Sequence, residues 1–356
     1  MKDNKLNSLN IAVMYIGAIM GAGFASGRET WQFFGVFGKW GIVGAVFFAI
    51  IFMALGHIIR YNAKVLQTNN MGKIIVPGGN KKLEVFVETF MAVILAMIMV
   101  IMSAAGGALL HQQFGFDYYV GGVVIVVLTI VTVLGDFERI SRVFKYIMPV
   151  LCVSMIITCA VVMLSKPEVT DPDAVIMPSP VAPNWVVASL LYVCYNMMAL
   201  VSIVATSTIN AKDDKTAVTG ATMGGLFLGV LAMLILLTVQ CDPAFSQSMD
   251  MPVLGYADRI SRLMSNIYTV ILFCAIYSAA TSNYYGFTTR IKDGPKKKPI
   301  IILTAVGGFG LGLIGFKNIV SYISPIIGYI GIVIVVMLVC NFVAIRKKEK
   351  ENNGES

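Results

Sequence analysis

The stretch IMGAGFASGRETW (residues 19–31) decides how this sequence is interpreted. It follows an apolar run, residues 9–20, that is typical of the first half of a membrane helix. Three glycines fall within seven residues, and Arg28 and Glu29 follow directly. Apolar sequence then resumes with QFFGVFG. Because charges inside a membrane span are costly and usually functional, the stretch predicts a functional interruption of a transmembrane helix.

The composition is typical of a membrane protein. Of the 356 residues, 57% are hydrophobic and 13% are charged, whereas about 25% are charged in a typical soluble domain. The mean hydropathy of +0.81 places the chain among polytopic membrane proteins. The net charge of +8 comes from basic residues in short loops between apolar runs. A membrane explains this pattern better than a nucleic-acid partner does.

Cysteine and histidine give little support for an enzyme. The six cysteines form no CxxC pair and most lie in apolar runs, so we interpret them as small core residues. The two histidines, His57 and His111, belong to no metal-binding motif. We therefore expect that the protein is not an enzyme.

Ten apolar segments approach the length that a bilayer requires, since a core of about 30 Å needs roughly 20 residues per helix. They cover residues 9–37, 41–60, 83–110, 119–135, 144–165, 184–206, 216–240, 264–289, 299–316 and 319–345. Residues 250–260 predict a short helix in an external loop. We therefore expect an all-α polytopic membrane protein with ten transmembrane helices.

Basic residues are distributed unevenly between the loops. With the N-terminus inside, the cytoplasmic segments hold 21 of the 27 Lys and Arg residues and the external segments hold five. The positive-inside rule then predicts a multi-pass protein of the cell membrane with both termini cytoplasmic. Residues 346–356 (RKKEKENNGES) would form a cytoplasmic tail.

The ten segments divide into two halves of five, residues 1–165 and 184–345. Because five is odd, a repeated half would lie inverted in the membrane. The first segment is interrupted at Gly21–Gly27, and the sixth, SLLYVCYNMMALVSIVAT, carries Tyr195 and Asn196 in its middle. Paired interruptions in two halves are the best sequence indication of a transport site. We therefore expect a 5+5 inverted repeat in which helices 1 and 6 are broken.

An unwound turn would expose backbone groups at the bilayer midplane. Its free carbonyls could bind a cation, and the N–H groups of the restarting helix could bind a carboxylate. Such backbone is tolerated only inside protein or against a water-filled cavity, so the interruption predicts a cavity. Close helix packing is the alternative role of membrane glycines, and it suits Gly308 and Gly312 better than these.

The eighth segment contains AIYSAATSNYYG, in which Ser278, Thr281 and Ser282 share one helix face. Their hydroxyls could bond to carbonyls of their own helix. They could equally serve as oxygen ligands for a hard cation. The residues alone leave both interpretations open.

These motifs resemble the LeuT-fold transporters of the amino acid–polyamine–organocation superfamily, and GAGFASGRE looks like the bacterial YkvI family. Three further stretches are similar to the neurotransmitter:sodium symporter branch: ERISRVFKYIMPVL (residues 138–151) to the start of its fifth helix, NWVVASLLYVCYNMMALVSIVAT (residues 184–206) to its broken sixth helix, and AATS (residues 279–282) to its eighth-helix sodium motif. The likeness follows the order of segments over nearly the whole chain.

The resemblance implies one sodium site between segments one and eight. Its ligands would be the carbonyls of Gly21, Phe24 and Ser278 and the hydroxyls of Thr281 and Ser282. A second sodium is not implied. Arg28 stands where that branch has an asparagine, and the matching polar residue of segment seven is missing, with Phe227 near that position. Proton-coupled relatives carry a lysine in the middle of the fifth helix, whereas Lys145 lies nearer its cytoplasmic end, which favours sodium.

The substrate would bind between segments one and six. We predict contacts from Gly23, Ala25, Gly27, Arg28, Ser103, Tyr195 and Asn196. Arg28 could hold a substrate carboxylate as a forked donor. It could instead form an internal ion pair with Glu29 or another acid, and the sequence leaves this open.

The sequence therefore predicts a sodium-coupled symporter of a small amino acid or related zwitterion that works by alternating access. The same fold could carry a nucleobase or another uncharged solute, which would not require Arg28 and Glu29. A non-transporting sensor or scaffold is the third hypothesis, and it predicts a sizeable soluble domain. The expected partners are a small-molecule substrate and the lipid bilayer, with no nucleic acid.

Overall fold

The computed structural model describes residues 5–135 and 137–352, and within these ranges the side chains of 137–145 and 352 are outside the description. The motif at residues 138–151 therefore lies mostly outside the described side chains, as does Lys145. The described chain is built from helices, with one isolated β-bridge between Leu6 and Ala211.

The helices follow in this order: α1 (Ser8–Ile19), α2 (Ala22–Ala25), α3 (Arg28–Phe33), η1 (Gly35–Phe37), α4 (Lys39–Leu66), α5 (Met71–Ile75), η2 (Pro77–Gly79), α6 (Lys81–Phe114), α7 (Tyr118–Leu134), α8 (Phe137–Ser165), α9 (Trp185–Ile209), α10 (Asp214–Val239), α11 (Pro243–Ser248), α12 (Pro252–Ile260), α13 (Arg262–Thr288), α14 (Lys297–Gly312), α15 (Phe316–Asn318), the π-helix η3 (Ile319–Ile323) and α16 (Ser324–Asn352).

Each of the ten predicted segments coincides with helix. In the described residues, seven stretches of helix are long and apolar enough to cross a membrane: α4, α6, the described part of α8, α9, α10, α13, and the run from α15 through α16. Shorter helices cover the other predicted segments, namely α1 to α3, α7 and α14. The chain is thus a polytopic helical protein, and the number of ten spans stays a prediction.

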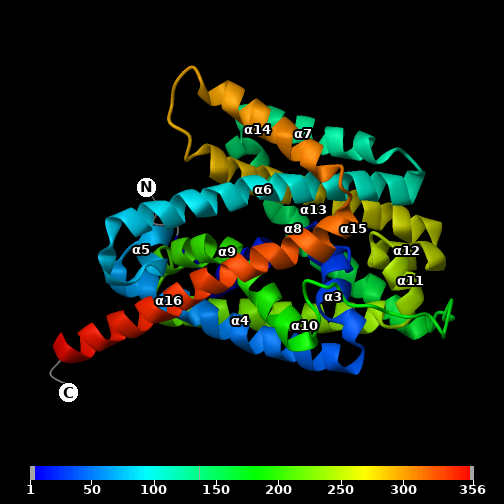
Figure 1. Cartoon of the computed structure of the whole chain (residues 1–356), viewed down its shortest axis with the longest axis horizontal. Helices are drawn as coiled ribbons and strands as arrows, with labels where there is room; N and C mark the ends of the chain where they lie inside the picture. Colours follow the sequence, from blue (N-terminus) through cyan, green and yellow to red (C-terminus); the bar gives the residue numbers. More distant parts are fainter. Residues whose placement is uncertain (1–4, 136, 353–356) are drawn as a thin grey trace.

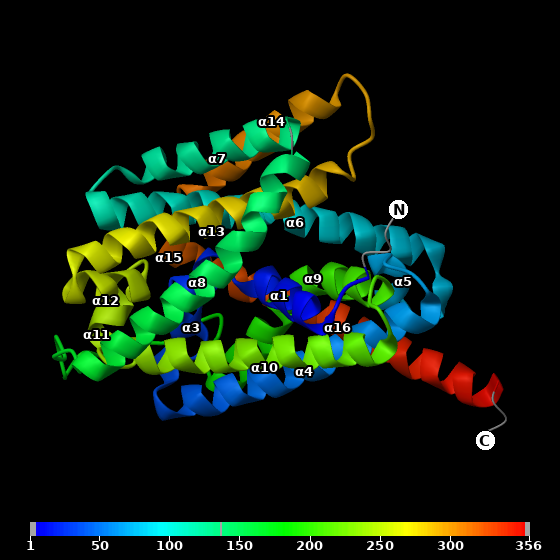
Figure 2. The same cartoon turned by 180° about the vertical axis from the view of Figure 1, so that it is seen from behind.

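The helices form two groups (Figures 1 and 2). In one group α1 packs on α10 and α4 packs on α9, and α16 lies along α9. In the other, α6 and α13 pack together and α7 and α14 cover them. Several of these pairs, such as α4 with α9, join one predicted half to the other. An inverted repeat predicts such exchange, although the inverted relation itself is not established by it.

The two ends of the bundle differ. The α11–α12 segment lies at one end, and the last turn of α16 lies at the opposite end (Figure 1). The chain near Leu6 also lies at this second end, because its N–H donates to the Asn210 carbonyl just after α9. This arrangement agrees with termini on one side and the 250–260 helix on the other. Which side is cytoplasmic remains a prediction.

The outer surface of the bundle is apolar. Large hydrophobic side chains such as Val85, Phe86 and Val131 are 62–65% exposed on α6 and α7. Several polar side chains are instead buried, including Glu29 and Arg28. This inversion of the pattern of soluble proteins fits helices whose solvent is lipid.

The interruption predicted in the first segment is present. Helix α1 ends at Ile19, and Gly21 then starts the four-residue α2 in an extended conformation. The chain turns again at Gly27, whose φ of +78° is left-handed, before α3 begins. Glycine suits this position because a Cβ strains such a conformation. The two glycine turns therefore divide the first span into three short helices.

The prediction that helix 6 is broken is wrong. Helix α9 runs without interruption from Trp185 to Ile209. The residues in its middle do not disturb it, because Asn196 Nδ2 donates to the Tyr192 carbonyl one turn earlier, at 3.0 Å. The segment also contains neither glycine nor proline, the residues that most often kink a helix. A polar residue with a partner in its own helix does not break that helix.

Candidate functional site

A small cavity of about 60 Å³ lies at the interruption of the first segment. Its walls combine residues of α1, α2, α3, α6, α9 and α13 with one residue of α16. The polar and glycine positions among them are Gly17, Gly21, Gly23, Glu29, Tyr195, Asn196 and Asn283. The cavity predicted from the interrupted helix is therefore present.

The Glu29 carboxylate is the charged group of this cavity. Its side chain is only 4% exposed. It accepts hydrogen bonds from the hydroxyls of Tyr192, at 3.1 Å, and Tyr195, at 3.5 Å, both on α9. The carboxylate also lies against α2, since a Cβ added to Gly23 would come within 2.2 Å of Glu29 Oε1. Glycine at position 23 thus makes room for the acid.

Arg28 points away from this cavity, toward α11. Its Nη1 donates to the carbonyls of Ser246 and Gln247, each at 3.3 Å, and Met249, at 3.0 Å. These carbonyls belong to the C-terminal end of α11, where a cation also complements the helix dipole. Trp31 adds a bond from Nε1 to Gln247 Oε1 at 3.2 Å. Arg28 therefore fixes the α11–α12 segment onto the interruption.

The ion pair that the sequence suggested between Arg28 and Glu29 is not among the described contacts. Neighbouring residues on a helix point about 100° apart. Here that separation sends Arg28 to the loop carbonyls and Glu29 to two tyrosines. The charges occupy different environments, although they are adjacent in sequence.

The predicted substrate contacts divide into two sets. Gly23, Tyr195 and Asn196 line the cavity together with Glu29. Ala25 and Gly27 lie outside its lining: the Ala25 carbonyl accepts a bond from the Tyr268 hydroxyl at 2.6 Å. A Cβ at Gly27 would meet Val253 Cγ2 at 2.7 Å. These two positions pack against α12 and α13.

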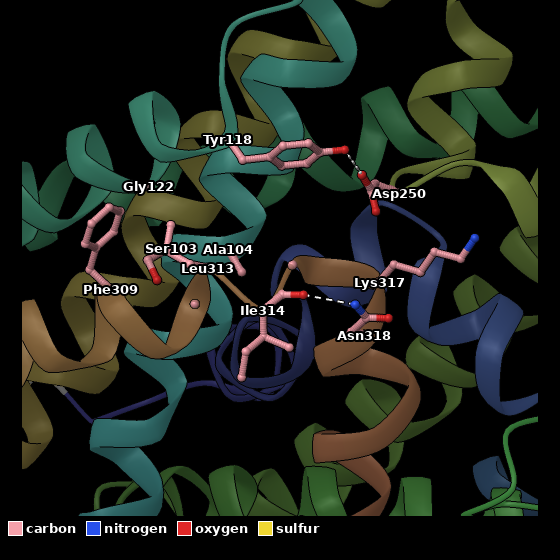
Figure 3. Close-up of a pocket in the computed structure, with 12 residues that line it drawn as sticks. Ser103, Ala104, Tyr118, Gly122, Asp250, Phe309, Leu313, Ile314, Lys317 and Asn318 are labelled. Carbon is pink, nitrogen blue, oxygen red and sulfur yellow. Dashed lines mark hydrogen bonds between the residues drawn. The ribbon is translucent and has the colours of Figure 1, made fainter.

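Ser103 lies in a different cavity, of about 360 Å³, between α6, α7 and α14 (Figure 3). Tyr118 and Asp250 close one side of it, with the Tyr118 hydroxyl donating to Asp250 Oδ2 at 2.9 Å. Lys317 also lines this outer cavity. Ser103 itself bonds to the Val100 carbonyl of its own helix at 3.0 Å. The structure therefore does not bring Ser103 to Glu29.

The predicted sodium ligands lie on neighbouring helices. Helices α13 and α2 touch at the bond from Tyr268 to Ala25, which lies more than three turns before Thr281 on α13. No hydrogen bond among the described residues joins Thr281 to Gly21 or Phe24. The Gly21 carbonyl accepts from the Ala25 N–H at 3.1 Å and the Phe24 carbonyl from the Gly27 N–H at 3.0 Å. A carbonyl oxygen has two lone pairs, so each of these keeps one for a further donor or cation.

Thr281 is the notable hydroxyl of the predicted sodium face. Ser278 and Thr281 are buried, whereas Ser282 is exposed. Thr281 Oγ1 has no hydrogen-bond partner among the described residues. Thr269, on the same helix, instead donates to the Ser265 carbonyl at 2.8 Å. A hydrogen bond to a carbonyl of the same helix therefore accounts for the hydroxyl of Thr269, but not for that of Thr281.

Sequence reasoning missed Ala279 and Asn283, which line the cavity. It also missed Tyr192, which lies outside the lining and donates to the Glu29 carboxylate. Tyr192 and Tyr195 are three residues apart, a spacing that could have indicated a shared face. Asn283 donates from Nδ2 to the Ala279 carbonyl at 2.8 Å. It lies beside the AATS motif, and a polar residue in that span was a further signal. Glu29 was considered as a partner for Arg28 and as a charge that an uncharged solute would not require, but it was not among the predicted substrate contacts.

Comparison with known proteins supports a membrane protein with a transporter fold. No protein-family model matches the chain. It is 24% identical to the "uncharacterized membrane protein YkvI" of Bacillus subtilis (strain 168), over 96% of this chain and 97% of that protein. The "uncharacterized protein YyaD" of the same organism is 22% identical over 92% of this chain and 94% of its own length. The expected likeness to YkvI is thus found.

Among solved structures, two mutants of the Eremococcus coleocola manganese transporter are similar to the chain. Each superposes with a TM-score of 0.54, at 12% identity, over 98% of this chain and 88% of the transporter. At this identity the likeness concerns the fold. Together with the apolar helices and the membrane relative, it shows that the chain is a helical membrane protein with the fold of a transporter.

Proposed function

We propose that the protein is a sodium-coupled secondary transporter of a small amino acid or related zwitterion. The observation that carries the proposal is the cavity at the interrupted first helix, whose walls combine residues of α1, α2, α3, α6, α9, α13 and α16. Interrupted helices at a midplane cavity are how many secondary transporters build their binding sites. The likeness in fold to a transporter supports the same conclusion.

Sodium enters the proposal as a co-substrate. A buried hydroxyl without a partner loses the hydrogen bonds that it makes in water, at a cost of about 1–3 kcal/mol. A bound sodium ion would provide the missing partner for Thr281 Oγ1. The carbonyls of Gly21, just before α2, and of Phe24, in α2, would complete an all-oxygen site. The exposed Ser282 could join it when the ion binds.

We do not assign the substrate carboxylate to Arg28. Its Nη1 already serves three carbonyls of the α11–α12 segment. This differs from the prediction that Arg28 holds a substrate carboxylate. The role that remains for Arg28 is to orient α3. We place the α11–α12 segment outside the cell and both termini in the cytoplasm, following the distribution of basic residues.

Two other solutes compete with a zwitterion. An uncharged solute such as a nucleobase would leave the Glu29 carboxylate to be balanced by sodium alone. A divalent metal ion is suggested by the name of the structural relatives. Against it, the described residues contain no group of three or more His, Cys, Asp or Glu side chains that could hold a metal.

The test is uptake into proteoliposomes that contain the purified protein. We expect uptake of at least one small amino acid under an inward sodium gradient, and little uptake when potassium replaces sodium. Thr281→Ala should remove the sodium dependence. Thr269→Ala is the matched control, because it removes a hydroxyl of the same helix that already has a partner. Uptake of manganese or of a nucleobase alone, or sodium dependence that survives in Thr281→Ala, would contradict the proposal.

A further inference from the structure

The position of Glu29 determines what the cavity can recognise. The carboxylate lies between the two short helices of the interruption, above Gly23 and beneath two tyrosines of α9. It lines the cavity together with Asn196 and Asn283. The acid is therefore part of the wall that a bound solute would touch.

No cation among the described residues neutralises this acid. The ion pairs of the described chain do not include Glu29. Its described polar contacts are the neutral hydroxyls of Tyr192 and Tyr195. The lining residues of the cavity contain no Lys, Arg or His in the described part of the chain. A buried carboxylate is costly unless a cation or a proton balances it.

The remaining polar groups of the cavity add acceptors to the carboxylate. Asn196 and Asn283 each use Nδ2 to donate to a carbonyl of their own helix. Each amide therefore keeps its oxygen free to accept a bond from a ligand. A wall with one carboxylate and two amide oxygens is complementary to a group that carries several N–H donors and a positive charge. An alkylammonium group has three such donors.

We propose that Glu29 binds the ammonium group of the transported solute. This inference rests on the proposed transport function and narrows the substrate to solutes that carry an amino group. The tyrosine hydroxyls orient the carboxylate from α9, and the ammonium approaches it from the cavity. The small volume of the cavity, about 60 Å³, favours an amine with a short side chain.

The experiment compares three ligands of similar size on the purified full-length protein, with sodium present and absent. The probes are alanine, its decarboxylated counterpart ethylamine, and propionate, which lacks the amino group. A screen of the other amino acids and their matching amines and acids covers larger side chains. Binding is measured as thermal stabilisation at increasing ligand concentration, which follows mass action.

We expect the wild-type protein to bind the amino acid or the amine and not the acid. Glu29→Gln keeps the size of the side chain and an oxygen acceptor for the tyrosines, but removes the charge. Affinity for ammonium ligands should fall by about tenfold or more, as for the loss of a hydrogen bond to a charged group. Glu29→Asp should restore part of it. Stabilisation by sodium alone should be unchanged in both variants.

Glu88→Gln provides the control, because Glu88 pairs with Arg290 and is not among the residues that line the cavity. Its affinities should equal those of the wild type. The inference is overturned if Glu29→Gln binds ammonium ligands as tightly as the wild type, or if it loses sodium binding instead. Binding of amines but not of amino acids would uphold Glu29 and reject the zwitterion. Sodium-dependent uptake of an amino acid that is unchanged in Glu29→Gln would uphold the zwitterion as substrate and reject the role of Glu29.

Discussion

The first predicted span and helix α9 were expected to be interrupted alike, and only one of them is. The first span divides into α1, α2 and α3, with glycines at both turns. Helix α9 carries Tyr195 and Asn196 at its centre and stays regular. The difference is that glycines allow the backbone of the first span to turn, whereas the polar side chains of α9 find partners without any change of backbone. Interruption depends on backbone freedom rather than on polarity.

Gly27→Ala should have the largest effect, because it tests whether the interruption of the first span requires glycine. The residue has a left-handed φ of +78°, and a Cβ would meet Val253 at 2.7 Å. The left-handed backbone costs about 1–2 kcal/mol for a non-glycine residue, and overpacking adds about 1–3 kcal/mol. We expect a clear fall in the melting temperature, measured in detergent by fluorescence scanning.

Gly310→Ala is the matched control for that variant. Position 310 lies inside α14, and no atom would lie within 4 Å of its Cβ. Alanine should stabilise this helix by up to about 1 kcal/mol. Equal melting temperatures for both variants would mean that the turn at Gly27 does not require glycine.

A second substitution tests whether the neighbouring residues Arg28 and Glu29 have different roles. Arg28→Gln removes a charged donor from the carbonyls of Ser246, Gln247 and Met249, which should cost about 1.5–3 kcal/mol. We expect faster hydrogen exchange over residues 243–251, measured by mass spectrometry. Affinity for ammonium ligands should change much less than it does in Glu29→Gln. Normal exchange together with a lost affinity would instead return Arg28 to the substrate site, as first predicted from the sequence.

The smallest expected effect comes from adding a glycine to the uninterrupted helix. Ala199 lies on α9 one turn from Tyr195 and lines the cavity. Ala199→Gly should cost about 1 kcal/mol in a helix interior, with helical content by circular dichroism unchanged. If the variant lost several times that amount or lost helix, α9 would be close to breaking, and the two spans would be more alike than they appear.

The fold was largely predictable, because membrane segments are recognised from length and hydropathy over many residues. The interruption was predictable too, since Gly21, Gly23 and Gly27 are visible in sequence. The continuity of α9 was less predictable, because only the structure shows that the Asn196 amide donates to a carbonyl of its own helix. The absence of glycine and proline from that segment was the signal available.

The roles of Arg28 and Glu29 could not be separated from sequence. The partners of Arg28 lie more than 200 positions away, on α11, and those of Glu29 lie on α9. Which of two adjacent charges faces the cavity depends on the rotation of α3, and tertiary contacts set that rotation. Ser103 illustrates the same limit, because only the packing of α6 against α14 places it in the outer cavity.

The unpaired carboxylate of Glu29 has an electrical consequence. With one sodium ion and a zwitterion bound to the ionised carboxylate, the charges of the proposed site sum to zero, whereas the empty site is negative as long as the carboxylate carries no proton. A membrane potential acts on the state that carries net charge, with about 2.3 kcal/mol per elementary charge per 100 mV. An interior-negative potential would therefore favour the return of the empty site toward the outside and leave the loaded step almost unaffected. Voltage would then set the turnover rate rather than the affinity for the solute.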